Sequence, residues 1–278
     1  MNLVIQGIDV ATGDLKRLAK MAGAVRIERC ATGEAFRLLH AEAQDGVADY
    51  CAQAGLDFAF VPDTRRLTDF RLLVMDMDST LINIECIDEI ADMAGLKNEV
   101  ATITAAAMRG EIADYIESLR RRVALLAGLD AGALERVHDE RLALNPGAEK
   151  LIRETKHAGL HTLLVSGGFT FFTDRLKARL AIDETRSNEL EMANGKLTGQ
   201  LLGPIIDGSA KRAALLETRD RLGISRAQIV AIGDGANDLG FMAEAGISVA
   251  YHAKPVVRER TTHALDYVGL DGVLNLFN

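Results

Sequence analysis

Residues 71–80 read RLLVMDMDST, an apolar run that leads directly into two carboxylates and two hydroxyls. An uninterrupted apolar run is typical of a parallel strand that is buried on both faces. At the end of such a strand, Asp76 and Asp78 would both face the crevice at its carboxyl edge. Taken alone, the stretch fits equally well a solvated loop in which Asp78, Ser79 or Thr80 caps a helix. The residues at the ends of the other strands decide between these two interpretations.

Two later strands are predicted to end in matching groups. The sequence SGG at 166–168 follows the predicted strand 161–165, and GDGAND at 233–238 follows the predicted strand 228–232. Separately, the first is more often a tight turn and the second a simple helix start. In an open α/β sheet, however, the carboxyl ends of neighbouring strands meet at one crevice. A serine hydroxyl and glycine N–H groups would there be available to an anion such as phosphate.

The acidic residues at these strand ends also suit a cation. Together, Asp76, Asp78, Asp234 and Asp238 supply enough carboxylate oxygen for a hard ion such as Mg²⁺. Lys211 begins the predicted helix 211–222, where a surface lysine is the default interpretation, but it could place its ammonium on a phosphate and on Asp76. The formal net charge of the chain is -8, so a phosphate site needs such local compensation.

The order of predicted elements indicates how the chain is organised. Between about 85 and 147 the pattern is helical throughout, and we expect a helical cap inserted into the α/β unit, with helices over 86–94, 98–108, 112–126 and 133–144. Helices and strands then alternate, which predicts a doubly wound parallel sheet with helices at 148–157, 171–180, 211–222 and 238–245 and a further strand at 247–250. Asn194-Gly195 between alternating residues predicts a hairpin. We assign residues 69–278 to this unit.

Residues 1–68 have a different order of elements. Strand-like and helix-like segments alternate as β-α-β-β-α-β, which predicts a small ferredoxin-like α+β domain. The alternative is that these segments are short elements of one larger sheet.

Four motifs in this order, DMDST, SGG, Lys211 and GDGAND, resemble those of the haloacid dehalogenase (HAD) superfamily. Their exact residues are similar to those of its phosphoserine phosphatases. The resemblance spans about residues 70–278 and includes ECIDE at 85–89 and ESLRRRV at 117–123. It implies a Rossmann-like core and a Mg²⁺-dependent phosphoric monoester hydrolase. Such an enzyme releases serine from O-phospho-L-serine through an aspartyl phosphate, as the last step of serine biosynthesis. Some members carry N-terminal ACT domains, with which residues 1–68 are compatible.

The resemblance also implies the chemistry of the strand-end residues. Asp76 would be the nucleophile and Asp78 the general acid and base. The Mg²⁺ ion would be held by the carboxylates of Asp76 and Asp234 and by the backbone carbonyl of Asp78, with Asp238 supporting these ligands from behind. Asp78 must begin the reaction protonated, which requires a pKa above its usual value of about 3.9.

The remaining matches would bind the substrate. The phosphate would be held by Ser166, Gly167 and Asn237, and Lys211 would steady both the nucleophile and the phosphate. Glu85 would face the ammonium of phosphoserine, and Arg122 its carboxylate. Arg120 and Arg121 are the alternatives to Arg122, because the three arginines are consecutive in the sequence. Without the resemblance, Glu85 and Arg122 are more simply solvated helix charges.

Two other functions fit parts of the pattern. One is a phosphatase or phosphomutase for another small phosphometabolite on the same scaffold. The other is a non-enzymatic receiver whose aspartate is a phosphorylation switch, although a receiver needs neither Asp78 nor a helical cap.

The composition of the chain argues against several classes of protein. The charges are interspersed, so no footprint for nucleic acid is visible, and no stretch approaches the roughly 18 apolar residues of a membrane span. The three cysteines lack the spacing of a zinc site or a disulfide framework. We therefore expect a cytoplasmic protein with a small-molecule substrate. The protein could also form a homodimer, with the N-terminal segment contributing to the interface.

Overall fold

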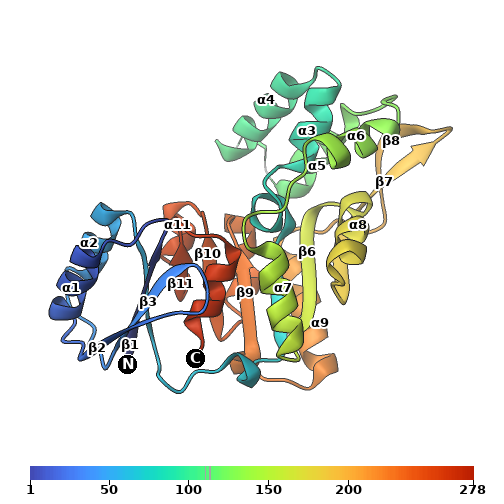
Figure 1. Cartoon of the computed structure of the whole chain (residues 1–278). Helices are drawn as coiled ribbons and strands as arrows, with labels where there is room; N and C mark the ends of the chain where they lie inside the picture. The colour runs from blue at the N-terminus through green and yellow to red at the C-terminus, as the bar shows by residue number, and fades with distance from the viewer. Residues whose placement is uncertain (110, 113) are drawn as a thin grey trace.

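The computed structural model describes residues 1–109, 111–112 and 114–278. The described chain contains a four-stranded sheet near the N-terminus and a seven-stranded sheet. A group of helices lies beyond one end of the strands of the larger sheet (Figure 1). Within this described part, no helix is long and apolar enough to cross a bilayer.

The larger sheet has the strand order β11-β10-β9-β5-β6-β7-β8. Its strands are parallel from β11 to β7, and β8 returns antiparallel to β7 as the predicted hairpin. The strand bounds are β5 Leu72–Met75, β6 His161–Phe169, β7 Glu184–Ala193, β8 Lys196–Leu202, β9 Ile229–Gly233, β10 Ile247–Tyr251 and β11 His263–Leu265. Met75 pairs with Leu164 on one side and Ile232 on the other, so Asp76, Val165 and Gly233, which follow these residues, lie side by side toward the carboxyl end of the sheet.

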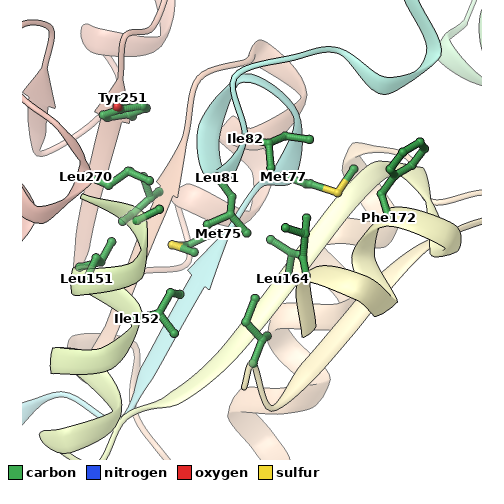
Figure 2. Packing of buried hydrophobic residues seen from close by; sticks show 14 of the residues in the cluster. Met75, Met77, Leu81, Ile82, Leu151, Ile152, Leu164, Phe172, Tyr251 and Leu270 are labelled. Carbon is green, nitrogen blue, oxygen red and sulfur yellow. The ribbon is translucent and has the colours of Figure 1, made fainter. Parts of the chain in front are cut away.

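The apolar run before Asp76 is buried on both faces of this sheet. Leu73 and Met75 pack into one hydrophobic cluster, in which Figure 2 shows Met75 near Leu151, Ile152 and Leu164. Leu72 and Val74 point to the opposite face and join a second cluster. The α-helices that follow the cap in the chain are α7 Ala148–His157, α8 Thr170–Leu180, α9 Gly208–Leu222, α10 Leu239–Met242 and α11 Pro255–Arg258. The predicted doubly wound α/β core is confirmed.

Four helices lie between β5 and the next strand, as expected of a cap: α3 Cys86–Met93, α4 Lys97–Met108, α5 Tyr115–Ala124 and α6 Gly132–Glu140. Two predicted ends were wrong by three or more residues. The helix expected from 112 begins at Tyr115, because the carboxylate of Asp114 accepts the N–H of Glu117 at 2.7 Å and caps it. The helix expected to reach 144 stops at Glu140, because Leu144 pairs with Ile82 in a bridge between the two chain segments that enter and leave the cap.

The N-terminal strands form a sheet of their own, in the antiparallel order β2-β3-β1-β4. The elements are β1 Asn2–Gly7, α1 Thr12–Met21, β2 Arg26–Arg29, β3 Glu34–Leu39, α2 Val47–Ala54 and β4 Asp57–Val61. This is the ferredoxin-like order, and the alternative of one larger sheet was wrong. One face of the sheet builds a separate core with α1 and α2, whereas Val4, Ala59 and Val61 join the main cluster of the larger unit. The boundary at 68 stays a prediction.

Candidate active site

A cavity of about 590 Å³ lies at the carboxyl edge of the central strands, with further walls from α3, α4 and α5. Eight of the predicted site residues line it: Asp76, Asp78, Glu85, Arg122, Gly167, Lys211, Asp234 and Asn237. The other two, Ser166 and Asp238, are fully buried beside it. The structure thus brings together residues that are up to 162 positions apart, from Asp76 to Asp238. Their individual roles remain predictions.

Lys211 connects two carboxylates beneath the cavity. Its ammonium Nζ donates to Oδ1 of Asp76 at 2.6 Å and to Oδ1 of Asp238 at 2.8 Å, and its side chain is only 1% exposed. Burial lowers the pKa of Lys211, but the two carboxylates more than offset this, so the net pKa is raised and the ammonium persists. The expectation that Lys211 begins its helix was wrong. Asp207 caps α9 by accepting the N–H of Ala210, which places Lys211 in the first turn.

Three acidic residues meet closely enough to share a cation. Asp76, Asp234 and Asp238 each offer an oxygen, and these oxygens lie within 4.8 Å of one another. Burial, and then the charge of Asp238, raises the pKa of Asp76 well above its usual value. Burial likewise raises the pKa of Asp234 to about 6, although the hydroxyl of Thr80 donates to its Oδ1 at 2.8 Å. One ammonium among two buried carboxylates and one half-buried carboxylate leaves excess negative charge, and hard oxygen donors of this kind fit Mg²⁺.

Asp78 lies between the start of α3 and strand β6. Its Oδ1 accepts the backbone N–H of Cys86 at 3.1 Å. Gly168 approaches from the other side, since a Cβ added there would lie 2.7 Å from Oδ2 of Asp78. Burial, together with the carboxylate of Glu85, raises the pKa of Asp78 to about 7. The requirement for a protonated carboxyl at the start of the reaction is therefore consistent with its surroundings.

The SGG sequence lies within strand β6. The predicted end of this strand at Val165 was wrong, because β6 continues to Phe169 and shifts register against β7 between these residues. The backbone N–H of Gly168 donates to Oγ of Ser166 at 2.8 Å, so that it is not free for a ligand here. Gly167 lines the cavity, and its carbonyl accepts the side-chain amide of Asn188 at 2.8 Å.

Glu85 and Arg122 both line the cavity from the cap side. Oε1 of Glu85 accepts the hydroxyl of Ser79 at 2.7 Å. Partial desolvation by the cavity walls raises the pKa of Glu85, and Ser79 and Arg122 oppose this rise. Nε of Arg122 reaches the carbonyl of Ser118 at 3.4 Å.

Arg120 and Arg121, the two alternatives to Arg122, are exposed and do not line the cavity. Arg121 pairs instead with Glu117 on the outer surface of α5.

Sequence reasoning missed several residues of this site. Thr80 is buried and bonds to Asp234, although the sequence suggested only a helix cap for it. The hydroxyl of Tyr115 lies over Gly167, where it would overlap an added Cβ. Lys254 lines the cavity from the segment after β10. The spacing next to Asp76 could have indicated Thr80, whereas Tyr115 and Lys254 belong to no motif.

Comparisons with known proteins agree with this arrangement. A family model described as haloacid dehalogenase-like hydrolase matches residues 73–243, more than half of the chain. The chain belongs to this hydrolase family. A second model, described as a domain of unknown function, matches residues 3–47. The family membership makes the chain a HAD hydrolase and removes the non-enzymatic receiver from consideration.

Individual HAD relatives match most of the chain. A phosphoserine phosphatase from Polaromonas sp. is 60% identical over 219 residues, covering 77% of this chain and 92% of the relative. A solved structure of a probable phosphoserine phosphatase from Vibrio cholerae has a TM-score of 0.86 at 36% identity, covering 99% of this chain and 85% of that one. A HAD family hydrolase from Salmonella enterica serovar Typhi has a TM-score of 0.90 at 30% identity, covering 100% and 98%. HAD hydrolases typically use a metal ion, and the three-carboxylate cluster offers oxygens that could hold one.

Proposed function

We propose that this HAD hydrolase is a phosphoserine phosphatase. The observation that carries the proposal is that one cavity combines a cluster of carboxylates around Asp76 with an acidic and a basic side chain on its cap side, Glu85 and Arg122. Phosphoserine has a phosphate, an ammonium and a carboxylate, and each would meet a group of opposite charge. The names of the HAD relatives support the same substrate.

We propose Mg²⁺ as the metal. The carboxylates of Asp76 and Asp234 and the backbone carbonyl of Asp78 would hold it, while Asp238 stays bonded to Lys211. A bound Mg²⁺ would neutralise charge on the phosphate and orient it.

In the first step, a carboxylate oxygen of Asp76 attacks phosphorus and the ester P–O bond breaks, which leaves an aspartyl phosphate. Asp78 gives its proton to the departing serine oxygen, because an alkoxide is a poor leaving group. Lys211 holds Oδ1 of Asp76 and thereby fixes the direction of the carboxylate. It also offsets negative charge at the reacting centre.

In the second step, water attacks the phosphorus of the aspartyl phosphate. Asp78, which has lost its proton, takes one from this water, and the bond between phosphorus and Asp76 breaks to release phosphate. A pKa of about 7 lets Asp78 act in both directions near neutral pH. Ser166, Gly167 and Asn237 would hold the phosphate throughout, with Ser166 acting from its buried position.

The test is phosphate release from a panel of phosphoamino acids and sugar phosphates, measured with and without Mg²⁺. We expect phosphoserine to be hydrolysed with the highest kcat/KM and only with the metal present. If a sugar phosphate were clearly preferred, the substrate would be another small phosphometabolite and not phosphoserine. No release from any phosphomonoester would contradict the phosphatase itself.

We also propose that the enzyme acts in the cytoplasm, where reducing conditions would keep Cys30, Cys51 and Cys86 as the free thiols seen in this structure. The homodimer remains a prediction that concerns residues 1–68. Light scattering on the purified protein measures the oligomeric state directly.

A further inference from the structure

The cavity contains a third cation, which has no part in the two-step reaction. Lys254 lines the cavity together with Asp76, Asp234 and Asn237. The residue is exposed, whereas Asp76 and Lys211 are buried, so Lys254 belongs to the solvent-facing part of the cavity lining. A lysine at such a place meets an incoming ligand before the buried groups do.

The backbone of Lys254 is held firmly by the fold. The residue lies after β10, which pairs in parallel with β9, the strand that leads into Asp234. Its carbonyl accepts the N–H of Val257 at 2.9 Å, and Val257 is fully buried. The neighbouring Ala253 is buried as well. The backbone at this lysine is therefore fixed after the strand that lies beside β9, which leads into the GDGAND sequence.

The charges around Lys254 indicate what it would bind. The cavity is lined by the carboxylates Asp76, Asp78, Glu85, Asp114 and Asp234, against the cations Arg122, Lys211 and Lys254. Lys211 is occupied by Asp76 and Asp238. Among residues 1–109, 111–112 and 114–278, no carboxylate lies within 4.0 Å of the Lys254 ammonium. Its charge is thus available to an anion from solution.

We infer that Lys254 attracts the phosphate group of the substrate to the cavity and helps to hold it there before Asp76 attacks. The inference extends the proposed function, since it names a binding residue for the phosphate of that reaction. Lys254 is a binding residue and transfers no proton. The fixed positive charge raises the local concentration of a dianion in an otherwise acidic cavity. Loss of this charge should therefore raise KM and weaken product inhibition by phosphate, and it should change kcat little.

The experiment uses the full chain with Mg²⁺ and p-nitrophenyl phosphate, which carries a phosphate but neither amino acid group. Lys254→Met is expected to raise KM, and the inhibition constant of inorganic phosphate, by about 5-fold, with kcat changed less than about 2-fold. Lys254→Arg should keep most of the wild-type KM, because it keeps the charge. Salt should weaken kcat/KM less in Lys254→Met than in the wild type.

Lys177→Met is the matched control. Lys177 is exposed on α8, lies outside the cavity and changes the net charge equally when replaced. Equal values for both methionine variants would overturn the inference. It would also be overturned if Lys254→Met lowered kcat and left KM unchanged, or if it affected phosphoserine but not p-nitrophenyl phosphate, since Lys254 would then serve the chemistry or the amino acid. A wild-type enzyme without phosphatase activity would instead contradict the proposed function.

Discussion

At the scale of single residues, Asp76 shows how the site combines reactivity with burial. Only 8% of its side chain is exposed, and Lys211 is the ammonium that holds it. Asp76→Asn replaces the attacking oxygen with an amide that is not a nucleophile, and we expect kcat to fall at least about 1000-fold. Acid-quenched wild type should retain radiolabelled phosphate and the variant none. Label on folded Asp76→Asn would assign the nucleophile elsewhere.

Arg122 carries the prediction of specificity. Arg122→Ala removes the partner of the substrate carboxylate, and a desolvated pair of this kind is worth about 2 kcal/mol or more, or about 30-fold in kcat/KM. We expect this loss for phosphoserine and little change for p-nitrophenyl phosphate. Lysine at this position should recover little, because an ammonium lacks the two-pronged grip of guanidinium. Arg120→Ala is the control, since Arg120 is exposed outside the cavity. Equal losses on both substrates would mean that Arg122 supports the cap instead.

The carboxylate cluster predicts how metal and pH act together. In the metal-free protein the pKa of Asp234 is about 6, above its unfolded value of about 3.9. The folded state therefore binds more protons between these values, and this group's contribution to stability is lost as pH rises through about 6. Mg²⁺ requires the ionised form, so it should raise Tm more at about pH 7.5 than at about pH 5.

Calorimetry with and without Mg²⁺ measures this difference. Asp234→Asn should lose most of the metal effect at the higher pH, whereas the exposed Asp45→Ala should keep it. A metal effect that is equal at both pH values in the wild type would show that Asp234 does not exchange a proton for the metal.

At the scale of elements, the periodic pattern of the sequence predicted which segments are helices and strands, and it failed at their ends. The start of α9 depends on the capping carboxylate of Asp207, which moved Lys211 into the first turn. Strand β6 runs through SGG because β7 pairs with it beyond Val165, which local turn propensity does not reveal. Tertiary pairing extended β6, and a side-chain cap set the start of α9.

The motif order was enough to predict that Asp76, Gly167 and Asp234 share one site, because parallel strands of one sheet carry them to the same edge. Lys254 could not be predicted in this way, because its place depends on β10 lying beside β9. Tyr115 depends on how the cap sits over β6. Side chains that reach a site through packing rather than through a motif leave no local signal.

Strand β6 also predicts a steric requirement at Gly168. A Cβ there would lie 2.7 Å from Oδ2 of Asp78 and 2.7 Å from Cε of Met77. Gly168→Ala should therefore displace the Asp78 carboxyl, and because a small misplacement of a catalytic group is costly, we expect kcat to fall about 100-fold. Gly13→Ala is the control, since nothing lies within 4 Å of a Cβ at that position. Unchanged kcat in Gly168→Ala would show that Met77 and Asp78 adjust freely.

At the scale of the whole molecule, the N-terminal unit is bound to the phosphatase core through both apolar and polar contacts. Val4, Ala59 and Val61 belong to the main hydrophobic cluster of the core. Arg37 donates to the carbonyls of Asn275 and Phe277 at 2.9 and 2.7 Å. None of these residues lines the catalytic cavity. Residues 1–68 are therefore expected to support the stability of the enzyme and not its chemistry, and their removal would expose apolar core surface to water.

Asp57 tests this attachment with a single substitution. It is 4% exposed, and its carboxylate accepts the backbone N–H groups of Asp266, Tyr267 and Val268 at 2.7, 3.0 and 3.1 Å. Asp57→Ala leaves these three donors without their partner, which should lower the free energy of unfolding by about 3 kcal/mol. Urea denaturation measures this loss, and the exposed Asp45→Ala should show almost none.

The kcat of Asp57→Ala, assayed well below its midpoint of unfolding, should stay within about 2-fold of the wild type, because Asp57 does not line the cavity. Unchanged stability would mean that the apolar contacts alone hold the N-terminal unit. A large fall in kcat with stability intact would mean that this unit shapes the active site through the segment after β11. Loss of stability with preserved kcat is the outcome that the two packed units predict, because they share a hydrophobic cluster but not a catalytic cavity.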